Sequence, residues 1–182
     1  MRAPDFQQLV DRQYARLYRF ALSLSKSESD AADLTQQTFF LWAAKGHRLR
    51  DHSKAKSWLF TTLYREFLGR RRREARFPQI ELDEVRENEM SILPNVNAVD
   101  CTSVLQALQE VEEPFRAPLT LFYLEQFSYQ EIAEVLDVPV GTVMSRLSRG
   151  KTRLRRRLLS KKEALGNKII PIQSQRTEGK RG

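Results

Sequence analysis

The sequence predicts an all-α protein made of two small helical domains that are joined by a flexible linker. Apolar residues recur at three- and four-residue intervals in both halves of the chain, which is the spacing of one helical face. Between these halves the period is lost and the composition becomes acidic. A length of 182 residues suits two compact units of this size. We expect a helical domain over 1–76, an acidic flexible linker over 77–100, a helix-turn-helix domain over 101–162 and a basic, disordered tail over 163–182.

The first two helices follow from the opening residues. A single apolar stripe predicts the first helix, and it consists of Phe6, Leu9, Val10, Tyr14, Leu17, Ala21 and Leu24. Ser27 or Ser29 is suited to cap a second helix, whose first turn carries Asp30 and Asp33, because carboxylates are favourable at a helix N-terminus. Phe40 in this second helix has two interpretations that the sequence leaves open. It is either an exposed aromatic on a protein-binding surface or a residue that packs on the next helix.

A third helix is predicted after a loop at 44–57 that is rich in Lys, Arg and His. It starts at about Lys54 or Ser57 and ends in the basic run at 70–73. Its apolar and aromatic residues are Trp58, Leu59, Phe60, Leu63, Tyr64, Phe67 and Leu68. Aromatic rings interleaved with cations are typical of a single-strand-binding surface. A unit this small also needs large side chains in its core, so we expect most of these rings to be buried, with Tyr64 and Arg65 as the exposed exceptions.

The linker and the start of the second domain are marked by prolines and acidic residues. Residues 77–100 contain six acids against one Arg, which disfavours their lying along DNA. Helical spacing returns after Cys101, and Pro114 and Pro118 bracket the expected start of the next helix. Gly166 is expected to break the last helix, and we expect the tail after it to be disordered.

A helix-turn-helix is predicted between these points. Ser128 and Glu131 have the spacing of a capping box, which starts a helix. The tripeptide 137–139 reads Asp-Val-Pro, in which the Asp tolerates a left-handed backbone and the Pro favours the first turn of a new helix. At about a hundred degrees per residue, the inner face of the second helix holds Val140, Val143, Leu147 and Leu154.

The opposite face of this second helix is polar and basic. It holds Thr142, Ser145, Arg149 and Arg156, with Arg146 and Arg153 on its flank. Such a face is suited to a DNA major groove, where the N-terminal part of the helix meets base edges. A plain helical corner with a solvated basic face is the alternative.

Charge along the chain favours a polyanionic partner. The net charge is +8 and the pI is about 9.9. Residues 65–76 hold six Arg against two Glu, and residues 146–162 hold nine Lys or Arg and no acid. These two basic blocks, separated by acidic stretches, indicate two nucleic-acid-facing surfaces.

Several classes of function and site lack support in the sequence. The single cysteine, Cys101, excludes an intrachain disulfide and a multi-thiolate metal site. His47 and His52 have no thiolate or paired carboxylate near them, so we expect no zinc and no other cofactor. No convergent carboxylate cluster, activated nucleophile or phosphate-cradling glycine loop supports an enzyme. The absence of a signal-peptide core and of a long apolar run predicts a cytoplasmic protein without membrane insertion.

Two stretches resemble known segments of one family. Residues 141–151, Gly-Thr-Val-Met-Ser-Arg-Leu-Ser-Arg-Gly-Lys, look like the recognition helix of region 4 in bacterial RNA polymerase sigma factors, in the form of the extracytoplasmic-function group. Residues 129–133 resemble the preceding helix of that motif. Residues 30–39 are similar to region 2.2, and Trp58-Leu59 with the following arginine-rich helix end is similar to regions 2.3 and 2.4. The resemblance covers about residues 5 to 160.

The resemblance implies a sigma factor that brings polymerase to promoters, and it assigns three sets of contact residues. Binding to the clamp helices of the largest polymerase subunit is implied for Asp33, Gln36, Gln37 and Phe40. Contact with the melted minus-ten strand is implied for His47, Arg48, Trp58, Tyr64 and Arg65. Reading of the minus-thirty-five duplex is implied for Thr142, Ser145, Arg146, Arg149, Lys151 and Arg153. An anti-sigma partner is a further expectation, since family members are often held by one.

The chain departs from the family pattern at two positions. Arg65 stands where family members commonly carry Asn, and Gly69 stands where they carry Asp. These changes make the third helix more basic and bear on how the minus-ten element is recognised. A stand-alone helix-turn-helix regulator, using only the second domain, is the competing hypothesis.

Overall fold

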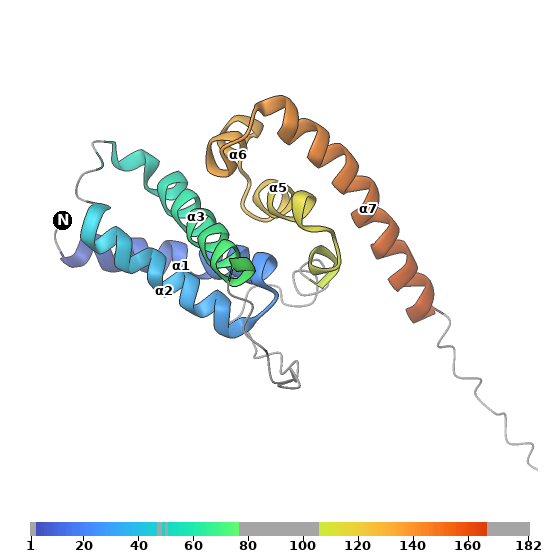
Figure 1. The fold of residues 1–182 in the computed structure, drawn as a ribbon, viewed down its shortest axis with the longest axis horizontal. Coiled ribbons are helices and arrows are strands. Elements are labelled where there is room, and N and C mark those ends of the chain that lie inside the picture. Colours follow the sequence, from blue (N-terminus) through green and yellow to red (C-terminus); the bar gives the residue numbers. More distant parts are fainter. Residues whose placement is uncertain (1–2, 47–48, 50, 77–105, 167–182) are drawn as a thin grey trace, which may run out of the picture.

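The computed structural model describes residues 3–46, 49, 51–76 and 106–166, and these are helical apart from short connections. The all-α prediction is confirmed. Figure 1 shows the N-terminal helices on one side of the molecule and the C-terminal helices on the other. The elements are α1 Ala3–Ser25, α2 Glu28–Lys45, the 3-10 turn η2 His52–Lys54, α3 Ala55–Arg76, α5 Glu113–Tyr123, α6 Tyr129–Leu136 and α7 Val140–Gly166.

Helices α1, α2 and α3 form a three-helix unit around apolar and aromatic side chains. Leu17, Phe20, Leu34 and Leu59 are almost fully buried in it. The rings of Phe20 and Phe60 lie 5.4 Å apart, so α1 and α3 are joined by aromatic packing. Of the predicted stripe of α1, Leu17, Ala21 and Leu24 are buried, whereas Tyr14 is 41% exposed and Phe20, which lay outside the stripe, is in the core.

Local signals explain where α2 and α3 begin and end. Ser27 is the N-cap of α2, and its side chain accepts a hydrogen bond from the Asp30 N–H. A Cβ atom at Gly46 would lie 2.7 Å from the Trp42 ring, so only glycine fits where α2 ends. Asp51 caps η2, and α3 then begins at Ala55, between the two expected starting points.

The helix-turn-helix forms as the sequence predicts. The Ser128 side chain accepts from the Glu131 N–H at 3.2 Å, while the Glu131 carboxylate accepts from the Ser128 N–H at 2.8 Å. Asp137 adopts φ 54° and ψ 52°, the left-handed conformation that ends α6. The N–H groups of Thr142 and Val143 both donate to the Pro139 carbonyl, which starts α7.

The inner face of α7 is confirmed at three of its four predicted positions. Val143, Leu147 and Leu154 are buried. Val140 is 39% exposed, so it is not buried as the other three are. It is the first residue of α7 and lines a hollow between α6 and α7, so its side chain keeps contact with solvent.

The prolines of α5 also differ in part from the expectation. Pro114 lies in the first turn, where its missing N–H costs nothing, but Pro118 lies inside the helix rather than at its start. The predicted linker lies outside the described residues. The disordered tail was expected from 163, but α7 continues to Gly166, so this start is wrong, and the residues after 166 lie outside the described residues.

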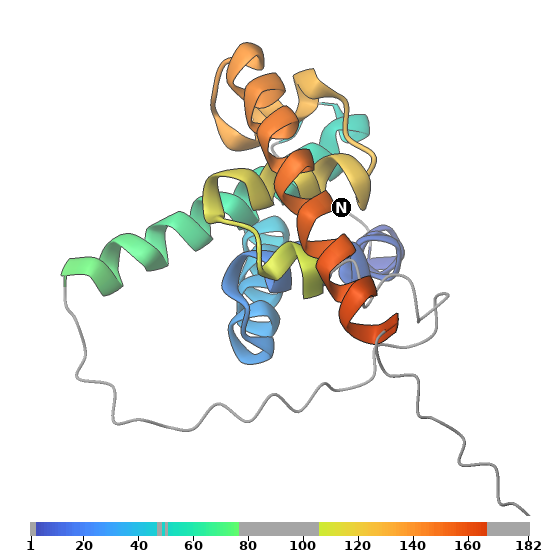
Figure 2. The same ribbon diagram turned by 90° about the vertical axis from the view of Figure 1, so that its right-hand side faces the viewer.

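The two helical units pack directly against each other, which the sequence did not predict. Phe127, which precedes α6, meets Phe60 of α3 with ring centroids 5.0 Å apart, and both side chains are buried. Helix α5 packs on α1 and α6 packs on α3, while α7 packs on α5 and α6, and Figure 2 gives a second view of this arrangement. Buried residues of both units belong to one continuous hydrophobic cluster.

Candidate nucleic-acid and protein interfaces

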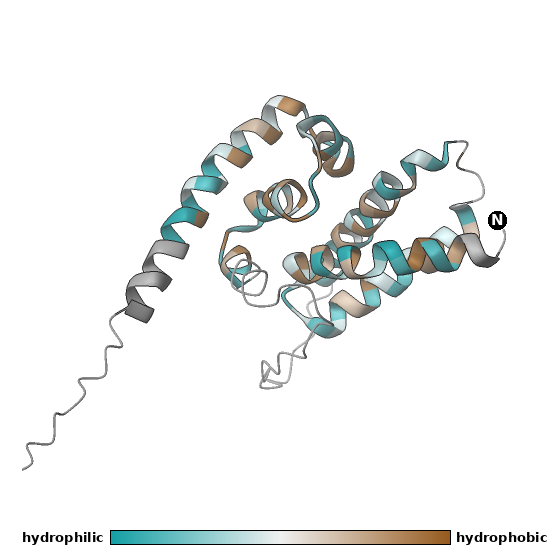
Figure 3. Cartoon of the chain, turned by 180° about the vertical axis from the view of Figure 1, so that it is seen from behind, coloured by the Kyte–Doolittle hydropathy of each residue, from teal (hydrophilic) through white to brown (hydrophobic). Residues whose placement is uncertain are grey.

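The outer face of α7 presents the polar side chains that the sequence singled out. Ser145, Arg149 and Lys151 are exposed, while Thr142 and Arg146 are half-buried. The Ser145 hydroxyl donates to the Thr142 carbonyl at 3.0 Å, which leaves its oxygen as an acceptor. Figure 3 shows apolar and polar positions alternating along the described part of α7, as an amphipathic helix requires.

Arg153, unlike the exposed Arg149 and Lys151, contacts side chains of the same domain. Its guanidinium pairs with the Glu112 carboxylate and lies 4.2 Å from the centre of the Phe115 ring. Nearby, a Cβ atom at Gly150 would come within 3.0 Å of Phe115 and of Leu119. Glycine at position 150 thus lets α7 approach α5 closely. The ion pair and the cation–π contact of Arg153 hold the two helices together. The structure gives Arg153 a role within the domain that sequence reasoning missed.

The predicted polymerase-binding residues form one stripe on α2. They lie at helical spacing, with Asp33, Gln36 and Phe40 exposed and Gln37 half-buried. The opposite face of α2 carries the buried Leu34 and Trp42.

Phe40 resolves the alternative that the sequence left open. Its side chain is 67% exposed, so it does not pack on the next helix. The neighbouring Phe39 is instead buried and stacks on Tyr14, with ring centroids 6.3 Å apart. An aromatic side chain this exposed in a polar stripe is a ready anchor for a protein partner.

The predicted minus-ten residues are only partly brought to one surface. Arg65 is exposed as expected, but Tyr64 is half-buried beside Phe20, which corrects its assignment as an exposed residue. Burial raises the pKa of Tyr64, nearby Arg146 lowers it and Glu113 raises it further. Trp58 is half-buried and packs edge-to-face on Trp42 at 5.1 Å, while Phe60 and Phe67 lie in the core as expected. His47 and Arg48 lie outside the described residues.

Glu125 is a functional candidate that the sequence analysis did not identify. It follows α5, and its side chain is fully buried between the two helical units. Its carboxylate accepts hydrogen bonds from Arg16 Nε at 2.7 Å and from Arg19 Nη2 at 3.3 Å. Burial raises the pKa of Glu125, whereas the hydrogen bond and charge of Arg16 and those of Arg19 lower it. A carboxylate inside an otherwise apolar stretch was the only signal in the sequence.

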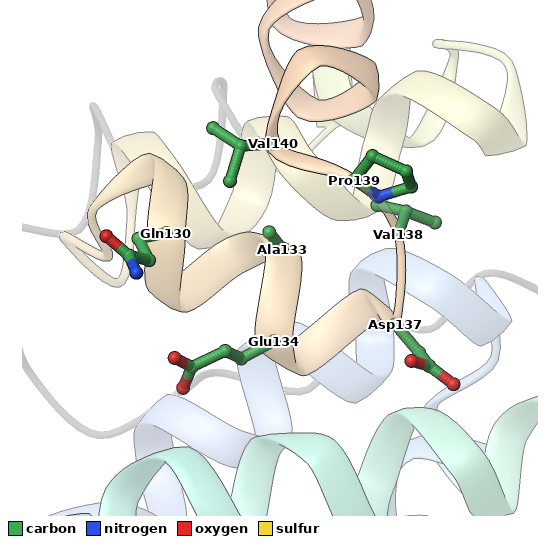
Figure 4. A pocket seen from close by; sticks show the side chains of 7 residues that line it. All are labelled: Gln130, Ala133, Glu134, Asp137, Val138, Pro139 and Val140. Carbon is green, nitrogen blue, oxygen red and sulfur yellow. The ribbon is translucent and has the colours of Figure 1, made fainter.

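A shallow hollow of about 420 Å³ lies in the helix-turn-helix corner, and Figure 4 shows the side chains around it. Its lining residues are Gln130, Ala133, Glu134, Asp137, Val138, Pro139 and Val140. Its two carboxylates make it unsuited to phosphate, so the hollow does not extend the basic face of α7.

Within the described residues, no group of three or more His, Cys, Asp or Glu side chains is arranged to hold a metal ion. None of the helices searched there has the length and apolar character needed to cross a membrane.

Comparison with protein families gives two matches that together span most of the chain. The family model for sigma-70 region 2 matches residues 9–77, and the model for sigma-70 region 4 matches residues 101–154. These ranges contain the α2 stripe and the helix-turn-helix, respectively.

Individual relatives agree with these matches. The ECF RNA polymerase sigma factor SigM of Bacillus subtilis is 30% identical over 76% of this chain and 86% of its own length. SigE of Mycolicibacterium smegmatis is 33% identical over 84% of this chain, but the match spans only 61% of SigE.

Solved structures show the same arrangement of helices. The sigma factor RpoE of Bartonella quintana, solved with the anti-sigma factor NepR, has a TM-score of 0.71 at 32% identity, covering 85% of this chain and 96% of RpoE. CnrH, solved with the cytosolic domain of CnrY, has a TM-score of 0.63 at 23% identity, covering 87% of this chain and 90% of CnrH, and supports the fold alone.

Proposed function

The chain belongs to the ECF group of RNA polymerase sigma factors, and on this premise we propose that it directs the polymerase core to specific promoters. In this proposal the N-terminal unit holds the core and the melted minus-ten strand, while the C-terminal unit reads the minus-thirty-five duplex. The observation that carries it is the division of α7 into a buried apolar face and an exposed basic face on a helix-turn-helix. The protein acts as a specificity subunit, not as an enzyme, and works in the cytoplasm with the polymerase.

Duplex reading is assigned to the first turns of α7. The N-terminal residues of a recognition helix meet base edges in the major groove. Arg149 is exposed on this part and has the fork of donors that pairs with guanine O6 and N7. Thr142, Ser145, Arg146 and Lys151 supply further base or phosphate contacts. Arg153 contributes indirectly by holding α7 on α5.

Strand capture is assigned to α3 and the loop before it. Arg65 offers an exposed cation, and the half-buried rings of Trp58 and Tyr64 keep part of their surface available for stacking with an unpaired base. Unstacking costs a few kcal/mol per base, which contacts of this kind offset. Because this unit holds single strand while α7 holds duplex, strand opening needs no ATP.

Core binding is assigned to the stripe of Asp33, Gln36, Gln37 and Phe40. A central aromatic ring surrounded by polar side chains is the usual composition of an energetically important interface site. An anti-sigma protein is a second proposed partner. Support for this partner comes from RpoE, which was solved with an anti-sigma factor and whose match covers 85% of this chain.

Transcription with purified core polymerase tests the proposal. Adding this protein should produce transcripts from a cognate promoter that core enzyme alone does not initiate. No transcript from any promoter selected by the reconstituted holoenzyme would reject it. Gel shift with and without core separates it from the stand-alone regulator, which binds its operator tightly without polymerase.

A further inference from the structure

The hollow in the helix-turn-helix corner has an apolar centre and an acidic edge. Ala133 of α6 and Val140 of α7 face one another across it, while Glu134 and Asp137 lie along its α6 side (Figure 4). Val140 is 39% exposed, whereas Val143, one turn further along α7, is fully buried. The hollow, of about 420 Å³, therefore keeps apolar surface in contact with water.

Met144 extends this apolar surface along α7. It lies four residues after Val140, on the same side of the helix, and its side chain is 53% exposed. Methionine side chains are flexible and polarisable, and they are enriched at protein interfaces. We call the set of Ala133, Glu134, Asp137, Val140 and Met144 the corner surface.

The corner surface differs in charge from the rest of the domain. The chain carries a net charge of +8, and residues 140–157 contain no acid. Glu134 and Asp137 are exposed, and neither forms an ion pair with a side chain of the described residues. An apolar centre beside two available carboxylates suits an arginine, because its stem packs on apolar side chains while its guanidinium pairs with a carboxylate.

The corner surface lies on the opposite side of α7 from the residues proposed to read DNA. Arg149 follows Val140 by nine residues, which turns it by about 180° around the helix at about 100° per residue. Thr142, two residues after Val140, is turned by about 200°. An occupant of the corner surface can therefore be present while the outer face of α7 lies in a major groove.

The shape of the hollow favours a protein over a small molecule. Sites for small molecules enclose most of the ligand surface. This hollow is shallow instead, and Gln130, Glu134 and Pro139 around it are exposed. A side chain that projects from another protein surface fits such a site better than a free ligand does.

The tail of the same chain is too short to bring its apolar residues to this site. The apolar stretch 169–172 ends six residues after Gly166, which is a span of about 20 Å when fully extended. Helix α7 places Gly166 about 40 Å from Val140. The occupant therefore comes from a separate molecule.

We propose that the corner surface is a docking site for a separate protein, which inserts an apolar side chain beside Val140 and pairs an adjacent arginine with Glu134 or Asp137. This inference goes beyond the proposed function. A surface this small gives weak binding alone. Binding strengthens when the partner and this chain are held on the same DNA, because the local concentration of the partner is then high. The site thus suits a partner that accompanies the promoter complex, not one that blocks the DNA-reading face.

Selection of short random peptides displayed on phage tests this chemistry on the full chain. The library is first depleted on a Glu134→Lys, Val140→Asp double variant and is then selected on wild type. Enriched peptides should carry an arginine within one helical turn of a large apolar residue. If no peptide is enriched after depletion, or if the enriched peptides are acidic, the proposal is overturned.

Affinities of the enriched peptides, made synthetically and labelled, are then measured by fluorescence anisotropy. Glu134→Lys should weaken binding at least tenfold, and Met144→Ala, which leaves the start of α7 intact, should also weaken it. The matched control is Glu74→Lys, an exposed glutamate on α3, which should leave the affinity as in wild type. Circular dichroism checks that the helix content of each variant is retained. Equal affinity for wild type and both corner variants would refute the docking site.

Two further measurements address DNA and self-association. Saturating the holoenzyme with promoter duplex should leave the peptide affinity unchanged, and competition between peptide and duplex would contradict the placement of the site away from DNA. Sedimentation of the free chain should show a monomer. A dimer that is lost in Glu134→Lys would assign the corner surface to a second copy of this chain and overturn the proposal. Because peptide binding by the free chain needs neither polymerase nor promoter, it succeeds or fails independently of the proposed function.

Discussion

Arg149 is the exposed cation best placed to distinguish one base pair from another. Replacing it with Ala should cost about 1–3 kcal/mol of duplex affinity if it reads a base, because a bidentate contact is lost. Selectivity should relax at one promoter position. Competition binding of the holoenzyme to single-base promoter variants measures this. A uniform loss across all variants would show that Arg149 contacts phosphate only.

Arg153 provides the matched comparison, because it is another arginine on the same helix. Arg153→Ala removes a partly exposed ion pair and a cation–π contact, each worth about 0–1 kcal/mol. It should lower the thermal midpoint of the protein slightly and leave base selectivity as in wild type. A change in selectivity equal to that of Arg149→Ala would contradict its assignment to the contact between α7 and α5.

Asp33 supplies the negative charge of the α2 stripe. Its carboxylate is 61% exposed and lies 3.9 Å from Arg70, so it remains available to a partner. Asp33→Arg should weaken core binding by at least tenfold, or about 1.4 kcal/mol, because a reversed charge now faces the partner surface. Surface plasmon resonance with immobilised core measures the affinity. Glu74→Arg, the same change at an exposed site on α3, should have little effect, and unchanged affinity in Asp33→Arg would reject the interface.

At the scale of single elements, the start of α6 depends on the ionisation of Glu131. Hydrogen bonds from the Ser128 backbone and side chain hold the pKa of Glu131 below its usual range; burial opposes this in part, and the charge of Lys56 lowers the pKa further. Because the folded pKa is depressed, this carboxylate stabilises the fold above its unfolded pKa of about 4.3, and the contribution is lost as pH falls through the folded value.

A Glu131→Gln variant separates the charge from the hydrogen bond. Gln keeps an oxygen that can accept from the Ser128 N–H, so the cap persists without a titrating group. Wild type should lose stability relative to this variant when the pH is lowered below about 4.3. Thermal unfolding over a pH series checks the difference. Parallel curves for the two proteins across the series would show that the cap does not depend on the charge.

The sequence predicts an element well when the signal for it is local. The corner of α6 and α7 follows from Ser128, Glu131 and Asp137, which lie within ten residues and interact with their own neighbours. Phe40 was ambiguous because helical spacing does not tell which of two adjacent rings a neighbouring helix covers; α1 covers Phe39 and leaves Phe40 exposed. The exposure of Val140 was missed because periodicity gives the side of a helix but does not show that a hollow separates this residue from α6, whereas Val143, one turn later, is fully buried.

For the molecule as a whole, the contact between the units was the main feature missed. Glu125 and its partners Arg16 and Arg19 are more than a hundred positions apart, and no periodic pattern links residues at that separation. Tyr64 appeared exposed on a helix considered alone, but α1 covers part of it and the C-terminal unit brings Arg146 close. The α2 stripe and the first turns of α7 needed only one helix each, which is why Phe40, Ser145 and Arg149 are exposed; the contacts of Arg153 with α5 involve a second helix and were missed.

Helix α7 also fixes a direction in space. It runs unbroken from Val140 to Gly166, a length of about 40 Å, and Figure 1 shows its far end extending away from the other helices. Since the residues proposed to read the duplex occupy the first turns of the same helix, the orientation of a bound duplex would also set the position of Gly166. A segment attached at Gly166 would therefore begin about 40 Å, the length of α7, from the proposed site of base contact.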